Sequence, residues 1–223
     1  MKKFLFLFLI ISGFSYAQQP TRTILKTFDM SEEMYDFDTQ QKISAVESKE
    51  KISSGKFFPL PKSYNERAEA IDYYLLPALK KGERLNTSKF YSQPKIGKTF
   101  PPFIATSYKG ETIKSSNFKG KIIIINFQMS LEEPMFNKQS FREFLKVSNS
   151  DDRFYPVLFI TMAMHEDLIE EYEVAMPIID NAFQYGNKYG VETYPNYIVV
   201  DTTGKTVAII NSVKQLAKVL RKL

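Results

Sequence analysis

The second half of this 223-residue chain predicts an α/β fold in which a mixed sheet is flanked by helices. Residues 121–127 form a run of β-branched and aromatic side chains, which is typical of a strand covered on both faces. Residues 156–161 form a second run of this kind, and amphipathic segments with helical spacing follow both runs. This alternation of strands and helices indicates a mixed sheet with helices on both faces.

Two turns and a set of helices complete the expected second half. Lys109-Gly110 is typical of a hairpin turn, and the segment 201–204 separates two further apolar runs in the same way. Gly190 indicates the end of a short helix. Helices are therefore expected over about 134–145, 165–172, 181–189 and 212–223.

The segment 18–94 is more polar, and we expect it to form a mainly helical N-terminal extension. Polar and small residues over about 31–54 indicate a first helix. The proline-containing segment 57–61 is expected to be an extended connector. Asn65 is expected to cap a second helix, because four apolar residues follow it at helical spacing: Ala68, Ile71, Leu75 and Leu79.

The N-terminal residues 1–17 have the features of a secretory signal peptide. Lys2 and Lys3 precede the apolar run 4–11, and Ser15 and Ala17 supply the small residues of a cleavage site. We therefore expect cleavage after Ala17 and a destination in the periplasm or outside the cell. No other stretch is long and apolar enough to span a bilayer, so no membrane span is expected after cleavage.

Composition excludes several classes of chemistry. The sequence contains no cysteine, which excludes disulfides, thiolate metal sites and cysteine-based catalysis within these residues. His165 is the only histidine, and an exposed helix-start residue is favoured over a metal ligand or general base. The net charge of +5 comes from scattered bases, so no nucleic-acid partner is expected. No nucleotide-binding motif is present, and neither a cofactor nor a metal is expected.

Five segments over 95–210 resemble, in the correct order, motifs of the thioredoxin-like redoxins. This family includes exported thiol–disulfide interchange proteins and the alkyl hydroperoxide reductase/thiol-specific antioxidant group. The segments are Lys95 to Phe103, Lys109 to Ile113 followed by Phe118 to Lys121, Ile124 to Phe127, Tyr189 to Val191 followed by Tyr194-Pro195, and Asp201 to Lys205. The resemblance implies a thioredoxin-like domain over 95–223.

The active-site motif of the family is missing from this sequence. The resemblance implies two cysteines shortly after Phe127, where Glu132 and Met135 stand instead, with Glu133 and Pro134 between them. Thiol–disulfide exchange needs a thiolate that attacks a disulfide sulfur. Neither a carboxylate nor a thioether can perform this step, so the family's disulfide exchange and thiol peroxidase activities are not expected here.

Three interpretations of the degenerate positions 132–135 stay open. Carboxylates and a proline suit the first turn of a helix, so these residues are interpreted first as helix-capping groups. They could instead form a remnant binding surface, or support a new carboxylate chemistry. The resemblance implies that Pro195 is cis and lies beside this helix, where it is either structural or binds an extended peptide together with Tyr194.

The leading hypothesis from the sequence is an exported, thioredoxin-like pseudoenzyme that binds a protein or peptide of the cell envelope. The alternative is an enzyme of redoxin ancestry with non-thiol, carboxylate or metal-assisted chemistry. A third hypothesis is a purely structural domain attached through its N-terminal half. Metal analysis separates the second hypothesis from the others, and capture of a partner separates the first from the third.

Overall fold

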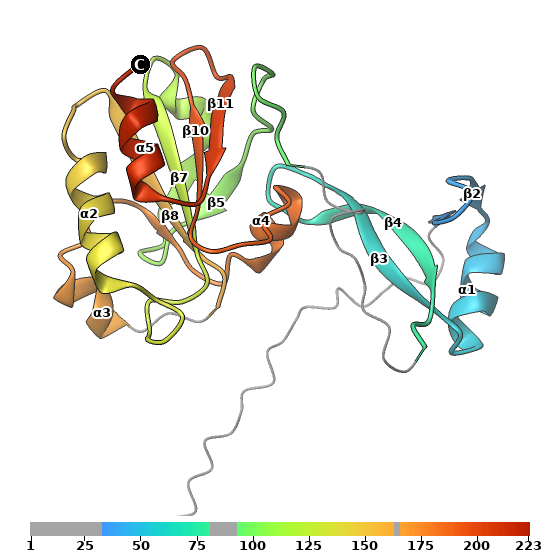
Figure 1. Ribbon diagram of the computed structural model, residues 1–223. Coiled ribbons are helices and arrows are strands. Elements are labelled where there is room, and N and C mark those ends of the chain that lie inside the picture. The colour runs from blue at the N-terminus through green and yellow to red at the C-terminus, as the bar shows by residue number, and fades with distance from the viewer. Residues whose placement is uncertain (1–32, 81–92, 163–165) are drawn as a thin grey trace, which may run out of the picture.

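The computed structural model describes residues 33–80, 93–162 and 166–223, which form a larger and a smaller unit (Figure 1). The larger unit is built on a five-stranded sheet of order β11-β10-β7-β8-β9. Strands β7, β8 and β9 are parallel, whereas β10 is antiparallel to both β7 and β11. The bounds are β7 Ile122–Gln128, β8 Phe154–Ile160, β9 Ile178–Ile179, β10 Asn196–Val200 and β11 Thr206–Ile210. The predicted mixed sheet is confirmed.

Helices cover one face of this sheet, and a helix with a hairpin covers the other. Every residue of β7 is buried, as its unbroken apolar run predicts. The first face packs against α2 (Lys138–Ser148), α3 (Glu166–Glu171) and α5 (Val213–Leu220). The second face packs against α4 (Phe183–Lys188) and the hairpin of β5 (Ile104–Thr106) and β6 (Thr112–Lys114), which a 3₁₀ turn over Ser115–Phe118 follows.

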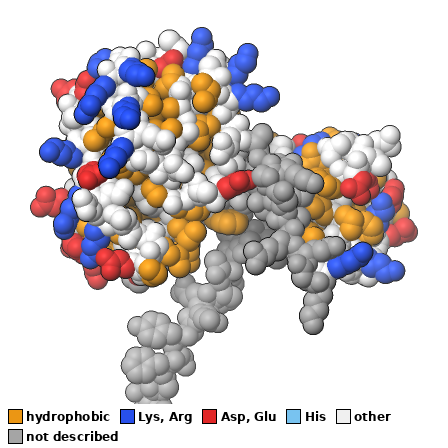
Figure 2. Space-filling model, viewed as in Figure 1, with side chains coloured by type: hydrophobic (Ala, Val, Ile, Leu, Met, Phe, Trp, Pro, Cys, Tyr) orange, Lys and Arg blue, Asp and Glu red, His pale blue; other side chains and the backbone are white. Residues whose placement is uncertain are grey.

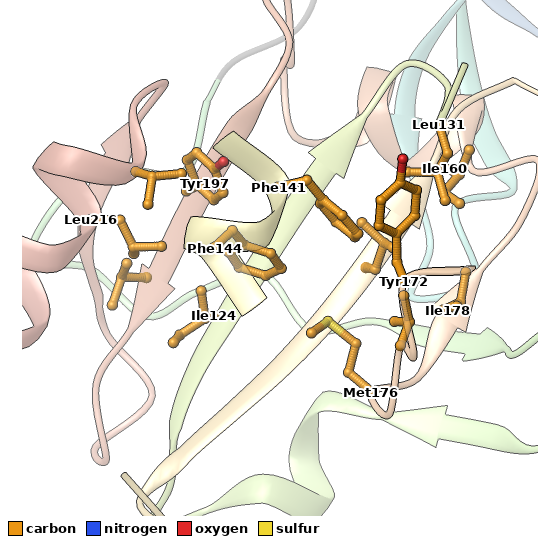
Figure 3. Close-up of a cluster of buried hydrophobic side chains, with 14 of the residues drawn as sticks. Ile124, Leu131, Phe141, Phe144, Ile160, Tyr172, Met176, Ile178, Tyr197 and Leu216 are labelled. Carbon is orange, nitrogen blue, oxygen red and sulfur yellow. The ribbon is translucent and has the colours of Figure 1, made fainter. Parts of the chain in front are cut away.

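Aromatic side chains form much of the core under α2. The ring centroids of Phe144 and Tyr197 are 5.5 Å apart, and Phe141 lies 5.6 Å from Tyr172 in an edge-to-face arrangement (Figure 3). Burial raises the pKa of Tyr197 above its usual value. These contacts fix α2 and the segment after α3 on the sheet, and they therefore position the loop that precedes α2.

The smaller unit, residues 33–80, is mainly β rather than mainly helical. Its four-stranded sheet has the order β2-β1-β4-β3, and one helix packs beside it. The bounds are β1 Met34–Asp36, β2 Lys42–Ile43, α1 Ala45–Ser53, β3 Phe57–Tyr64 and β4 Ala70–Pro77. The expectation of a mainly helical extension is therefore wrong for the described residues.

Two local features explain this correction. Asn65 does not cap a helix: its side-chain oxygen accepts hydrogen bonds from the backbone N–H groups of Arg67 (2.8 Å) and Glu69 (3.0 Å), which closes the turn between β3 and β4. After this turn, β4 contains Ile71, Tyr73 and Tyr74, which are of types favoured in strands, and it pairs with β3 along its length. The first helix, predicted over about 31–54, is confined to α1. Ser44 caps its start, because the Ser44 hydroxyl oxygen accepts a hydrogen bond from Glu47 N at 3.2 Å.

The turn at Asn65 connects the two units. Lys188 of α4 donates hydrogen bonds to the carbonyl oxygens of Asn65 (2.9 Å) and Pro102 (2.6 Å), and Ile104 N donates to Glu66 O at 2.9 Å. Burial lowers the pKa of Lys188 to about 8, while nearby Glu66 opposes this shift. The smaller unit thus lies on the side of the larger unit away from α2 and α5 (Figure 1).

The predicted signal peptide, residues 1–17, and His165 lie outside the described residues. Within the described ranges, no helix has the length and apolar character needed to cross a bilayer.

Candidate functional site

The strand register places the two predicted site segments at the same edge of the sheet. Phe127 of β7 lies opposite Asn196 of β10, and Asn126 lies opposite Tyr197. Because β7 and β10 are antiparallel, the chain that leaves β7 after Gln128 and the chain that enters β10 from Pro195 meet at this edge. The peptide bond between Tyr194 and Pro195 is cis. This edge is called the site edge below.

A loop of exposed residues joins β7 to α2 at the site edge. The side chains of Leu131 (2% exposed) and Phe136 (5% exposed) are buried and fix the two ends of the loop. The Phe136 ring lies edge-to-face with those of Phe141 and Tyr172, at centroid distances of 5.1 and 5.5 Å. Between these anchors, residues 132–135 are all exposed. The structure thus presents all four degenerate positions to solvent on a short, fixed loop.

The helix after this loop begins later than the sequence predicts. Lys138 is its first residue, and the Asn137 side chain caps it by accepting a hydrogen bond from Ser140 N at 2.8 Å. The interaction of a charge with a helix dipole is confined to the first turn, and the first turn of α2 contains no acid. The interpretation of Glu132 and Glu133 as helix-capping groups is therefore wrong, and Pro134 lies outside the first turn.

The reason is that Asn137 adopts an extended backbone conformation, with φ −108° and ψ 101°, and supplies its own side-chain cap. The residues before it consequently cannot continue the helix. Pro134 instead follows Glu133 through a cis peptide bond within the loop.

A shallow pocket of about 290 Å³ lies between this loop and α3. Its lining residues are Leu131, Glu132, Glu133, Lys138, Asp167 and Leu168. Lys138 also approaches Glu171, with 3.8 Å between its ammonium nitrogen and a carboxylate oxygen, and this carboxylate is the main cause of its raised pKa. Among these lining residues, Glu132, Glu133 and Asp167 carry carboxylates and Lys138 carries the ammonium group. The lining is therefore negatively charged overall and suits a cationic or amide group.

Tyr194 and Pro195 are half-buried beside the loop. The Tyr194 hydroxyl lies over Gly186 of α4, where a Cβ atom would meet it at 3.4 Å. The Tyr194 ring therefore packs inward against α4. The sequence left a structural role and peptide binding open for this segment. The inward ring favours a structural role for the Tyr194 side chain, so a ligand would meet the backbone before Pro195.

Exposed apolar side chains also border the site edge, and sequence reasoning did not predict them. Met135, Met162 and Phe183 are 54, 49 and 56% exposed. Met162 N donates to Met129 O at 2.9 Å, which places Met162 beside the start of the loop, and Ala182 N donates to Ile160 O at 2.8 Å, which brings the start of α4 to the end of β8. Figure 2 shows hydrophobic side chains along the lower border of the larger unit, where Figure 1 draws this loop.

One signal could have pointed to these residues. In open α/β sheets, ligands bind outside the carboxyl ends of the parallel strands, and Met162 and Phe183 follow the ends of β8 and β9. Within the described ranges, no group of three or more acidic or histidine side chains is arranged to hold a metal ion.

Comparison with known proteins gives relatives that match part of the chain. No family model matches the chain. The thiol-disulfide oxidoreductases ResA of Bacillus thuringiensis subsp. konkukian and Bacillus cereus are each 25% identical to it over 138 residues, which cover 57% of this chain and 78% of theirs.

Solved structures with a similar fold include the thioredoxin domain of a thiol-disulfide oxidoreductase from Bacteroides vulgatus. It is 21% identical, has a TM-score of 0.48, and the match covers 57% of this chain and 96% of that one. A peroxiredoxin-like protein from Aquifex aeolicus is 13% identical with a TM-score of 0.48, over 58% of this chain and 88% of that one. The ordered motifs, the mixed sheet and the ResA match make this chain similar to the thioredoxin-like redoxins, although its sequence contains no cysteine.

Proposed function

We propose that this chain is an exported, non-catalytic member of its family that binds a protein or peptide of the cell envelope at the site edge. The observation that carries the proposal is the loop at 132–135. By the resemblance of the flanking motifs, it stands where the family has its reactive thiols, and its four residues are exposed to solvent and include no thiol. Without a thiolate, no mixed disulfide forms, so we propose binding rather than thiol exchange for this surface.

The side chains at the site edge support binding of an extended segment. Met135, Met162 and Phe183 offer exposed apolar surface, and flexible thioether side chains adapt to different apolar partners. The pocket beside Glu132 and Glu133 adds negative charge. We therefore propose a partner segment that places an apolar side chain against Met135 and a lysine or arginine in the pocket.

Export is proposed from the N-terminal residues alone. A basic start, an apolar run over 4–11 and small residues before Gln18 are typical of a cleaved signal peptide. We also propose that residues 18–94 act as an extension of a thioredoxin-like domain over 95–223. The contact of the Asn65 turn with the end of α4 supports this, because it attaches the extension to the larger unit.

Binding of an envelope extract to the immobilised chain tests the proposal. The double charge reversal Glu132→Lys/Glu133→Lys should weaken recovery of the specific partner, because it removes the negative charge of the pocket. Glu50→Lys/Glu111→Lys is the matched control, since both residues are exposed and lie elsewhere. Both variants should keep the melting temperature of the parent chain.

Two results would contradict the proposal. Recovery that falls equally in the pocket variant and in its control would place the interface elsewhere. Turnover above that of boiled protein in an insulin-reduction or peroxide-consumption assay would show that the chain is a catalyst after all.

A further inference from the structure

The outer surface of α2 and α5 is strongly basic along both helices. These two helices contain one acid, Glu143. The exposed bases on them, and directly after α5, are Lys138, Arg142, Lys146, Lys214, Lys218, Arg221 and Lys222. Because α2 and α5 pack beside each other on the same face of the sheet, their bases share one surface (Figure 1). Figure 2 shows Lys and Arg side chains gathered over these helices.

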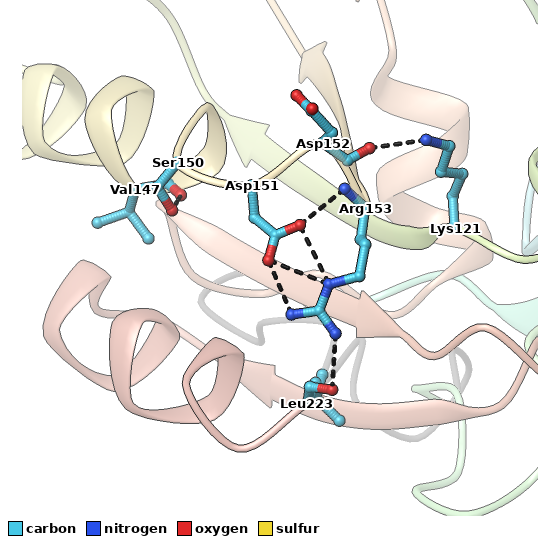
Figure 4. A network of polar contacts seen from close by, with 7 residues as sticks. All are labelled: Lys121, Val147, Ser150, Asp151, Asp152, Arg153 and Leu223. Carbon is cyan, nitrogen blue, oxygen red and sulfur yellow. Dashed lines mark hydrogen bonds and ion pairs between the residues drawn. The ribbon is translucent and has the colours of Figure 1, made fainter.

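Ion pairs within the described residues account for few of these bases. Lys138 approaches Glu171 at the start of α2, and Arg142 lies 6.0 Å from the centroid of the Tyr172 ring. Arg153, near the ends of both helices, is held by Asp151 at 2.7 Å and donates to Leu223 O (Figure 4). The remaining bases have no carboxylate within 4 Å in the part of the chain that the structure describes. We call Arg142, Lys146, Lys214, Lys218, Arg221 and Lys222 the basic face.

Helix stability explains only part of this pattern. Bases in the last turn of a helix interact favourably with its dipole, which accounts for Lys146 and Lys218. Bases in the first turn are unfavourable for the same reason. Lys138 at the start of α2 is compensated by Glu171. Lys214, the second residue of α5, has neither an acid in its own first turn nor a carboxylate within 4 Å among the described residues, and it therefore points to something outside the chain.

We propose that the basic face binds the surface of an anionic lipid bilayer. The two helices are about 16 and 12 Å long and lie roughly 10 Å apart, so their bases form a broad patch that can approach a flat surface together. Spread-out charge of this kind suits a membrane of anionic headgroups, where binding needs no shaped pocket.

A nucleic acid fits the same surface less well. Proteins that bind single strands stack bases on exposed aromatic rings. The aromatic residues of α2, Phe141 and Phe144, are buried in the core, and α5 has none. The basic face therefore offers charge without a stacking platform.

Membrane docking through this face would leave the rest of the molecule accessible. The site edge lies at the end of the sheet from which α2 begins, and the smaller unit lies on the far side of the larger unit (Figure 1). Lys138 lines the pocket of the site edge and is left out of the variants below. The inference is thus independent of the proposed partner binding.

Co-sedimentation of the full chain with vesicles tests this inference. Vesicles of phosphatidylcholine are compared with vesicles that also contain phosphatidylglycerol, so that any insertion of the N-terminal apolar segment contributes equally to both. The variant Arg142→Gln/Lys146→Gln/Lys214→Gln/Lys218→Gln removes four bases of the face. The matched control Lys49→Gln/Lys56→Gln/Lys114→Gln/Lys119→Gln removes the same charge from exposed positions elsewhere.

We expect binding that depends on phosphatidylglycerol and is lost at high salt, because the Debye length falls from about 10 Å at 0.1 M to about 3 Å at 1 M. Each base near an anionic surface strengthens binding by about fivefold, so the face variant, which lacks four of them, should bind about 600-fold more weakly. The control should bind like the parent, and both variants should unfold at the parent's temperature. Equal binding to both vesicles, an equal loss in the control, or binding of an oligonucleotide but not of phosphatidylglycerol would overturn the inference.

Discussion

Phe136→Ala should destabilise the chain strongly although it lies directly beside the exposed loop. The Phe136 side chain is 5% exposed and makes edge-to-face contacts with Phe141 and Tyr172. Truncation of a buried phenylalanine costs about 3–5 kcal/mol of the free energy of unfolding, and the lower end applies where surrounding groups can relax into the space. We expect about 3 kcal/mol here, since a loop adjoins the cavity. For a chain of this size, that corresponds to a melting temperature about 6–12 °C lower.

Met135→Ala is the matched control, because the neighbouring Met135 side chain is 54% exposed. Its free energy of unfolding should stay within about 0.5 kcal/mol of the parent value. Urea unfolding followed by far-UV circular dichroism measures both variants. Equal destabilisation of the two variants, or a larger loss in Met135→Ala than in Phe136→Ala, would mean that the Met135 side chain is buried in place of Phe136. Residues 132–135 would then not be the exposed positions, and the reasoning about the site edge would fail.

Three further predictions follow from particular residues. Asn137→Ala should lower the free energy of unfolding by about 1 kcal/mol, because it removes the cap of α2. Asn137→Ser should retain most of that free energy in urea unfolding, because serine also caps helices. Burial lowers the pKa of Lys188 to about 8 from its usual 10.5, so between these pH values the unfolded state binds more protons than the folded state. The free energy of unfolding should therefore rise with pH over this range. Lys188→Met should flatten the rise that urea unfolding measures between pH 8 and 10. Intact mass of material from an envelope fraction should show cleavage after Ala17, whereas a mass that retains residues 1–17 would contradict export by this signal.

The sheet of the larger unit could be predicted because its signals are local and agree with one another. Residues 121–127 are β-branched or aromatic at almost every position, and only a strand covered on both faces needs such a run. The hairpin at 201–204 is likewise a local matter: the Asp201 carboxylate accepts from the backbone N–H groups of Thr203 and Lys205, both at 2.9 Å.

The strand β4 could not be recognised from its pattern. Apolar residues occupy both faces of Ala70–Pro77, so the same residues satisfy a helical and an extended spacing. What decides between them is pairing with β3 across the turn at Asn65 and with β1, which lies much earlier in the sequence. Asn65 added to the error, because its side chain can cap a helix or close a turn with equally good local hydrogen bonds.

The local structure of the candidate loop could not be predicted from its sequence. The sequence places Glu132 and Met135 between β7 and α2, yet the cap at Asn137 moves the helix start beyond them. The position of Met162 and Phe183 after the ends of β8 and β9 pointed to this edge, but their exposure depends on where three strands end together rather than on any local pattern. Solvent exposure of an apolar residue is a property of the folded chain.

Site-specific photo-crosslinking most directly tests the central claim that the site edge is a binding surface. A photoreactive amino acid replaces Met135, and in a second variant it replaces Val46, which is 70% exposed on α1 of the smaller unit. After irradiation in an envelope extract, position 135 should give a discrete adduct that excess unlabelled parent chain suppresses, and position 46 should not. Absence of such an adduct at position 135, or the same adduct at both positions, would contradict the claim.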